Sequence, residues 1–270
     1  MRGYPGPMDL QLTGMRAFVS GSTQGIGYAI ARALLHEGAT VLINGRSDAS
    51  VSSAVERLRG EVKHAPVSGI AADLADAAQV DRLLNALGDV DILVNNAGLF
   101  EVAAFDEITD EEWQRYLDVN LLSGVRLSRH VLPGMLSRNR GRIIFVGSES
   151  GVNVPADMVH YGVTKAASIA LANGLAKLTR GTAVTVNTIL GGPTYSDGVA
   201  SVVEQISQGQ GMAADDLKSA IIAGNHTTLL ERFIEPQEIA NLALYLASPL
   251  SSATNGAALR ADGGVLTALL

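Results

Sequence analysis

Short apolar runs alternate with longer segments of helical periodicity along most of the 270-residue chain. The runs are continuous rather than alternating in polarity, which is typical of strands buried on both faces of a parallel sheet. They occupy residues 17–19, 41–43, 69–71, 92–94, 143–146, 184–186 and 258–259. The intervening helical spacing covers residues 28–36, 77–87, 111–136 and 159–179. The alternation predicts an α/β fold: a doubly wound, Rossmann-type parallel sheet of about seven strands with helices on both faces.

Residues 191–230 interrupt this rhythm. They contain Gly191-Gly192-Pro193 and a polar run over 205–211. The stretch is too long for an ordinary connection in an α/β fold, and long loops often have a function. We therefore expect a single dinucleotide-binding and catalytic domain over residues 1–270, with a mobile, partly helical substrate-loop insertion at about 191–230. The alternative is a disordered surface loop without a role.

The composition excludes several classes of protein. The chain has no cysteine, which excludes disulfides, thiolate metal sites and cysteine nucleophiles, and we expect no metal site. A net charge of −7 gives no sign of a nucleic-acid-binding surface. Residues 1–7 lack the apolar core of a signal peptide, and no apolar run approaches the length of a membrane span. We expect a soluble, cytoplasmic protein without nucleic-acid or membrane partners.

A glycine-rich turn follows the first predicted strand and leads into a helix. It reads Gly21-Ser22-Thr23-Gln24-Gly25-Ile26-Gly27. Glycines allow a sharp turn and close approach of a pyrophosphate, and the helix N-terminus supplies amide donors and a positive dipole end. The spacing G-x-x-x-G-x-G differs from the common G-x-G-x-x-G pattern, so a purely structural turn is the alternative interpretation.

Three further motifs stand in a fixed order after this turn. Asn95-Asn96-Ala97-Gly98 closes the fourth predicted strand, Tyr161 and Lys165 lie four apart on a predicted helix, and Ser148 precedes Tyr161 by thirteen residues. Together with the turn, this set resembles the short-chain dehydrogenase/reductase family over residues 10–264. The closing stretch 259–264 is similar to that family's last strand.

The spacing of Tyr161 and Lys165 places both side chains on one helix face. A nearby ammonium favours the phenolate, so we expect Lys165 to lower the pKa of Tyr161 from its usual value near 10. The resemblance implies that Tyr161 exchanges the proton with the substrate oxygen, that Lys165 also holds the nicotinamide ribose, and that Ser148 binds the substrate oxygen. Ser150 is the rival to Ser148. The resemblance also implies a proton-relay role for Asn120, against the alternative of a helix-packing residue.

The end of the second predicted strand bears on the choice of cofactor. The family's NAD-preferring members have an acidic residue where Gly45 stands, and Arg46 follows it. A guanidinium can hold a 2′-phosphate that a carboxylate would repel. We expect NADP(H) to be preferred and NAD(H) to be possible, because Gln24 rather than a basic residue stands in the turn. Cofactor contacts are expected from Gly21, Ser22, Gln24, Gly25, Ile26, Gly27, Arg46, Asp73, Leu74, Asn96, Gly98, Tyr161, Lys165, Thr194 and Ser196.

The resemblance implies hydride transfer between NADP(H) and a secondary alcohol or ketone: a 3-oxoacyl, sugar or polyol, or other small carbonyl compound. The alternatives are a non-catalytic NADP(H)-binding sensor on the same fold and an epimerase or dehydratase relative. We expect Met158, His160, Tyr195 and the insertion over 197–230 to line the pocket, and His226 to be structural or on the surface. A homotetramer is also expected, by pairing of the helices that carry Asn120 and Tyr161.

Overall fold

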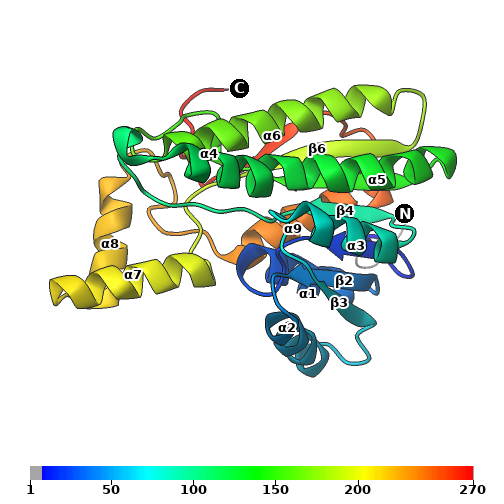
Figure 1. The fold of residues 1–270 in the computed structure, drawn as a ribbon, viewed down its shortest axis with the longest axis horizontal. Coiled ribbons are helices and arrows are strands. Elements are labelled where there is room, and N and C mark those ends of the chain that lie inside the picture. The colour runs from blue at the N-terminus through cyan, green and yellow to red at the C-terminus, as the bar shows by residue number, and fades with distance from the viewer. Residues whose placement is uncertain (1–7, 270) are drawn as a thin grey trace, which may run out of the picture.

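Seven parallel strands form one sheet in the order β3-β2-β1-β4-β5-β6-β7 (Figure 1). The computed structural model describes residues 8–269; residues 1–7, used above to argue against a signal peptide, lie outside that range. The strands are β1 (Arg16–Val19), β2 (Thr40–Gly45), β3 (Val67–Ala71), β4 (Ile92–Asn95), β5 (Gly141–Val146), β6 (Val184–Gly191) and β7 (Ala258–Ala261). The predicted fold class, a doubly wound parallel sheet, is confirmed.

Helices cover both faces of this sheet. They are α1 (Gly25–His36), α2 (Asp48–Glu61), α3 (Ala77–Leu87), α4 (Asp110–Leu117), α5 (Ser123–Ser137), α6 (Val159–Leu178), α7 (Asp197–Gln210), α8 (Ala214–Gly224) and α9 (Pro236–Ala247). Buried side chains of α1, α2 and α9 form one apolar cluster, and those of α3, α5 and α6 form another. The continuous apolar strands lie between these two clusters, which explains why both of their faces are hydrophobic.

The long helix predicted over 111–136 is interrupted. The structure has α4, then a π-helical turn over Asp118–Leu122, then α5. Turns of this kind change the hydrogen-bond register within a helix and are frequent at functional sites. Among the described residues, no helix is both long and apolar enough to cross a bilayer.

The strand order reverses direction between β1 and β4. The chain winds from β1 to β2 and β3 on one side, and then crosses to β4, β5, β6 and β7 on the other. In such sheets a crevice opens beyond the carboxyl ends of the strands at this point, and ligands bind there. The glycine turn after β1 and the Asn96 segment after β4 both lie at that crevice.

Residues 191–230 contain α7 and α8, which project together beyond the edge of the sheet (Figure 1, yellow to light orange). Ser196 caps α7, because its side chain accepts a hydrogen bond from the Val199 amide. The two helices pack against each other, with Val203 and Ser207 of α7 buried.

Candidate active site

The turn between β1 and α1 requires glycine. Gly21 has φ +58°, and a Cβ there would lie 2.9 Å from the Cα of Ala97. A Cβ on Gly27 would lie 2.4 Å from the side-chain nitrogen of Asn96. That Asn96 amide donates to the Gly21 carbonyl at 2.8 Å. The turn is therefore held against the end of β4, with no room for larger side chains.

Asn44, near the end of β2, fixes the same turn from the other side. Its buried side chain accepts from the Gly21 amide at 3.2 Å and donates to the carbonyls of Ile70 and Ala72 at 3.1 and 3.2 Å. One amide group thus ties the carboxyl ends of β1, β2 and β3 together. Asn44 was not among the predicted site residues, because its one signal in the sequence is a polar residue near the end of an apolar strand.

A carboxylate lies at the N-terminus of α1. The Gly25 amide, the first of the helix, donates to Oδ2 of Asp197 at 2.5 Å. Helix N-termini favour anions, and in dinucleotide-binding folds this end receives the pyrophosphate. Asp197 begins α7, so the insertion is linked to the cofactor turn by a group of the same charge as the cofactor. Neither sequence segment alone indicates this contact.

The expected 2′-phosphate position lies at the end of β2. Arg46 is exposed, and a Cβ on Gly45 would lie 2.4 Å from Cγ2 of Thr23. Position 45 carries no carboxylate, and an acidic side chain could not be placed there unless Thr23 moved. Arg57 of α2 is a second guanidinium nearby: it donates to the Thr23 carbonyl at 2.6 Å and lies 4.4 Å from the ring centre of Tyr28. Arg57 was also missed, because 34 residues separate it from Thr23.

Tyr161 and Lys165 lie on α6 and face the crevice. Lys165 is 6% exposed and donates to the Val146 carbonyl at 2.9 Å, and its ammonium lies 5.6 Å from the Tyr161 ring centre. Burial lowers the pKa of Lys165 from 10.5 to about 8. Helix spacing thus brings the two side chains together, as the sequence indicated.

The pKa of Tyr161 is shifted in the direction opposite to the expected one. Burial raises it, a hydrogen bond with Ser148 lowers it in part, and the Glu149 carboxylate raises it further. Lys165 does not offset this, because its ammonium points to the Val146 carbonyl and lies over the ring rather than at the hydroxyl. A raised pKa keeps the phenol protonated.

The hydrogen bonds distinguish Ser148 from Ser150. The Ser148 side chain interacts with Tyr161 and accepts from the Ser150 amide at 3.1 Å. The Ser150 hydroxyl instead donates to the Glu149 carboxylate at 2.8 Å. Ser148 is therefore the serine beside the tyrosine.

Asn120 occupies the π-helical turn and is buried. Its side chain accepts from the Leu99 amide at 2.7 Å and donates to the Leu99 carbonyl and to Oγ1 of Thr164, both at 3.0 Å. A Cβ on Gly98 would lie 3.4 Å from the Lys165 nitrogen and 3.7 Å from Oδ1 of Asn120. Asn120 therefore holds the segment after β4 beside Lys165.

One cleft of about 360 Å³ runs from the glycine turn to Tyr161 and Lys165. Its lining includes the predicted residues Gly21, Gln24, Gly25, Ile26, Arg46, Asp73, Leu74, Asn96, Gly98, Tyr161, Lys165 and Ser196. Among residues 8–269, no three His, Cys, Asp or Glu side chains are grouped to hold a metal ion.

Several predicted residues are used elsewhere. The buried Ser22 hydroxyl donates to the Val19 carbonyl at 2.6 Å, and the Thr194 hydroxyl donates to the Gly192 carbonyl at 2.9 Å. The cleft lining does not include Ser22, Gly27, Asn120, Ser148 or Thr194. Met158 and Tyr195, which were expected to line it, do not do so either. His160 is 2% exposed with its ring centre 4.0 Å from that of Tyr116, so it packs against α4. The expectation that His160 lines the cleft was wrong, because adjacent helical residues point in directions about 100° apart.

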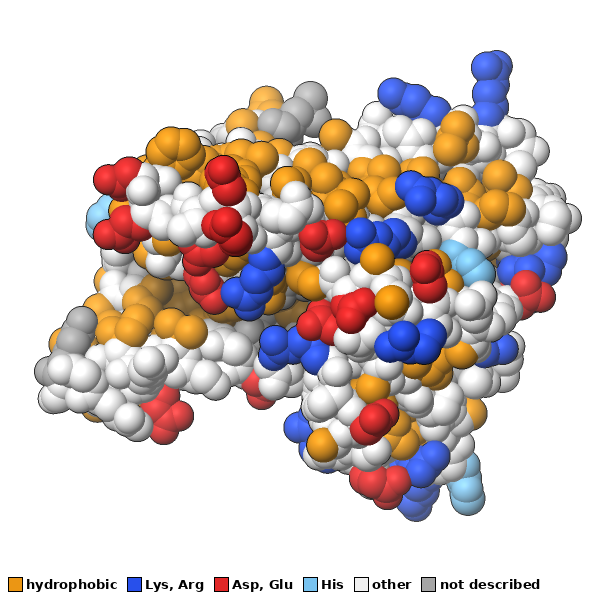
Figure 2. Space-filling model, in the orientation of Figure 1, with side chains coloured by type: hydrophobic (Ala, Val, Ile, Leu, Met, Phe, Trp, Pro, Cys, Tyr) orange, Lys and Arg blue, Asp and Glu red, His pale blue; other side chains and the backbone are white. Residues whose placement is uncertain are grey.

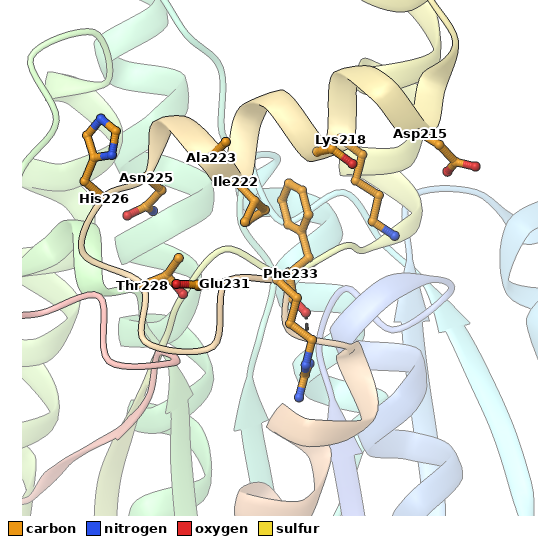
Figure 3. Close-up of a pocket in the computed structure, with 11 residues that line it drawn as sticks. Asp215, Lys218, Ile222, Ala223, Asn225, His226, Thr228, Glu231 and Phe233 are labelled. Atoms are coloured by element: carbon orange, nitrogen blue, oxygen red, sulfur yellow. Dashed lines mark hydrogen bonds between the residues drawn. The ribbon is translucent and has the colours of Figure 1, made fainter.

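A second pocket, of about 610 Å³, lies between α8 and residues 225–233 (Figure 3). Phe233 points towards α8, and Lys218 extends from α8 on the same side (Figure 3). Tyr195 packs outside the cleft, with its ring centre 5.4 Å from that of Phe233 and 3.9 Å from the Lys218 nitrogen. His226 also lines this pocket. None of the predicted catalytic residues is among those that line it.

The chain is similar to known proteins in both sequence and structure. Residues 15–207 match the family model described as short chain dehydrogenase. The chain is 45% identical to an uncharacterised oxidoreductase, YvrD, of Bacillus subtilis (97% of this chain, 100% of YvrD). It is 33% identical to a D-beta-hydroxybutyrate dehydrogenase of Cupriavidus necator (94% and 98%). The crystal structure of L-sorbose reductase from Gluconobacter frateurii with NADPH and L-sorbose superposes with a TM-score of 0.92 at 30% identity (97% and 100%).

Proposed function

Because this chain belongs to the short-chain dehydrogenase/reductase family and is an oxidoreductase of alcohol and carbonyl groups, we propose that it transfers hydride between NADP(H) and a secondary alcohol or ketone. One observation supports this above all others. The glycine turn, Arg46, Tyr161 and Lys165 line a single cleft, so the residues proposed for cofactor and proton transfer face the same space.

The nicotinamide would supply or accept the hydride, and the chain's own residues would handle the oxygen and the proton. In reduction, Tyr161 donates its phenolic proton to the carbonyl oxygen as negative charge develops there. The raised pKa of Tyr161 keeps that proton on the phenol at neutral pH. Ser148, beside the phenol, donates a second hydrogen bond to the same oxygen. Lys165, with a pKa of about 8, is mostly cationic at neutral pH. It would hold the ribose hydroxyls of the nicotinamide cofactor.

The residues present fit a dinucleotide phosphate. Gly21 and Gly25 line the cleft beside the N-terminus of α1, where backbone amides could donate to a pyrophosphate. Arg46 stands free of an acidic neighbour at position 45, so NADP(H) is preferred and NAD(H) is tolerated. Arg57 adds positive potential at the same rim.

The test separates cofactor binding from chemistry. Tyr161→Phe removes only the hydroxyl, so NADPH affinity, measured by fluorescence titration, should change little. Turnover of an accepted ketone should fall by roughly a hundredfold or more, the usual contribution of a general acid. Tyr245→Phe, on the partly exposed Tyr245 of α9, is the matched control and should keep full turnover. A Tyr161→Phe protein with near wild-type turnover would exclude this mechanism.

The homotetramer also belongs to this proposal. α6 exposes Val163 (43%) and Leu178 (62%), apolar side chains suited to contact with another copy. Light scattering should give four chains per particle, and a monomer at micromolar concentration would contradict it. The cytoplasmic location stays a prediction for cell fractionation.

A further inference from the structure

An apolar wall begins at the catalytic tyrosine. The ring of Phe100, in the segment after β4, meets the ring of Tyr161 edge-on, with centres 6.5 Å apart. Phe100 is 40% exposed and lines the cleft. On its far side, a Cβ on Gly198 would lie 3.8 Å from Cε1 of Phe100. Phe100 therefore connects Tyr161 to the first turn of α7.

The wall continues along α7. Val202 and Ile206 lie beyond the cleft lining, which ends at Gly198, and are 45% and 40% exposed although both are aliphatic. On a helical projection they lie between Gly198, which is close to Phe100, and the buried Val203. The strip from Gly198 to Ile206 is roughly 12 Å long at 1.5 Å per residue. Figure 2 shows hydrophobic side chains inside the hollow between α4 and α7.

Negative charge surrounds the opposite side of this hollow. Residues 101–112 contain six acidic side chains and no Lys or Arg. They are Glu101, Asp106, Glu107, Asp110, Glu111 and Glu112. Acidic side chains border the hollow in Figure 2, above α7. Arg46, Arg115 and Lys165 line the cleft itself, so the acidic side chains act at the rim of the hollow. The rim therefore disfavours anionic substrates.

We propose that this site takes an uncharged ketone or secondary alcohol bearing an apolar chain, which lies along Phe100, Val202 and Ile206. The inference rests on the proposed function and narrows its substrate class. A polyol would lose hydrogen bonds to water against these side chains, because they offer no replacement. A carboxylate or an acyl group on an acidic carrier would be repelled at the rim.

The first experiment measures kcat/KM with NADPH for methyl ketones from 2-butanone to 2-octanone. A fully buried methylene adds up to roughly fourfold to affinity, so four half-buried methylenes should raise kcat/KM about tenfold or more. L-sorbose and 3-oxobutyrate should be poorer substrates than 2-octanone. A flat series, or preference for the sugar or the acid, would overturn the proposal.

The second experiment places the effect on α7. Val202→Thr combined with Ile206→Thr should lower kcat/KM for 2-octanone by more than for 2-butanone. The chain-length gain, which is the ratio of these two kcat/KM values, should then fall to roughly threefold or less. Ile221→Thr, a similarly exposed position on α8 (41%), is the control and should leave the gain unchanged. If the double variant instead changes particle mass in light scattering and keeps the full gain, the strip is an interface between copies and the proposal fails.

A binding measurement distinguishes failure of this inference from failure of the proposed function. In the presence of NADP(H), 2-octanol should raise the thermal midpoint of the wild type more than 2-butanol does, and the double variant should lose that difference. Tyr161-dependent turnover without any chain-length effect in either assay would refute the apolar substrate and leave hydride transfer standing. A chain-length effect on binding without turnover would support the apolar binding strip and refute hydride transfer.

Discussion

Replacing Lys165 with Met should stabilise the nucleotide-free protein while it removes a residue of the active site. The Lys165 ammonium is buried, and within residues 8–269 the Val146 carbonyl is its one hydrogen-bond partner. Methionine has a similar length and no charge, so it fills the same space without desolvating an ion. We therefore expect the native Lys165 to lower the free energy of unfolding, because its charge is kept buried for its role in the active site.

The size of the effect follows from the lowered pKa. Because the folded-state pKa of about 8 lies below the unfolded value of 10.5, the protonated lysine favours unfolding. This penalty is fully present below about pH 8 and disappears as the pH rises towards 10.5. It amounts to roughly 3 kcal/mol at neutral pH and roughly 1 kcal/mol at about pH 9.5. Loss of the hydrogen bond to Val146 offsets about 1 kcal/mol.

Lys165→Met should therefore gain about 2 kcal/mol in free energy of unfolding near neutral pH and almost nothing near pH 9.5. Urea titration followed by the fluorescence of Trp113, the single tryptophan, measures both values. Lys177→Met, at an exposed position of the same helix, is the control and should show no such pH dependence. A variant less stable than the wild type near neutral pH, or one with the same gain at both pH values, would refute the reasoning.

Three further predictions concern the cofactor turn. Arg46→Ala should weaken NADPH roughly tenfold in fluorescence titrations and leave NADH unchanged; an unaltered ratio of the two affinities would remove Arg46 from the 2′-phosphate site. Asp197→Asn should tighten NADPH roughly three- to fivefold in the same titration, because a competing carboxylate leaves the Gly25 amide; weaker binding would contradict this. Asn44→Ala should lower the free energy of unfolding by about 3 kcal/mol and weaken NADPH, because it leaves the Gly21 amide and two carbonyls without partners; a urea-measured loss below about 1 kcal/mol would contradict it.

The sequence predicted the sheet well, because strands buried on both faces must be apolar throughout. All seven predicted runs overlap strands of the structure. Two helices were missed. The polar α2 has only a narrow stripe, formed by Val51, Ala54, Val55 and Leu58, to mark its buried face. α9 begins with Pro236, and proline is common at the first position of a helix, so the start of α9 could have been predicted from the sequence.

The candidate site was predictable where its chemistry depends on spacing along one helix, as for Tyr161 and Lys165. It was not predictable where contacts join distant segments. The Gly25–Asp197 hydrogen bond spans 172 residues, and nothing in either segment alone indicates the other. The direction of His160 depends on which face of α6 meets α4, which is a property of packing. The hydrogen bonds between Asn120 and Leu99 likewise join segments 21 residues apart.

The cleft is built from residues that lie far apart in the chain, and this has a consequence for folding. Its lining runs from Gly21 to Gly198, and β1 pairs with β4 rather than only with its sequence neighbour β2. Such non-local pairing slows folding, and a chain emerging from the ribosome cannot complete the cleft until α7 has been synthesised. Binding of a fluorescent nucleotide would therefore report the last steps of assembly rather than collapse of the first half of the sheet.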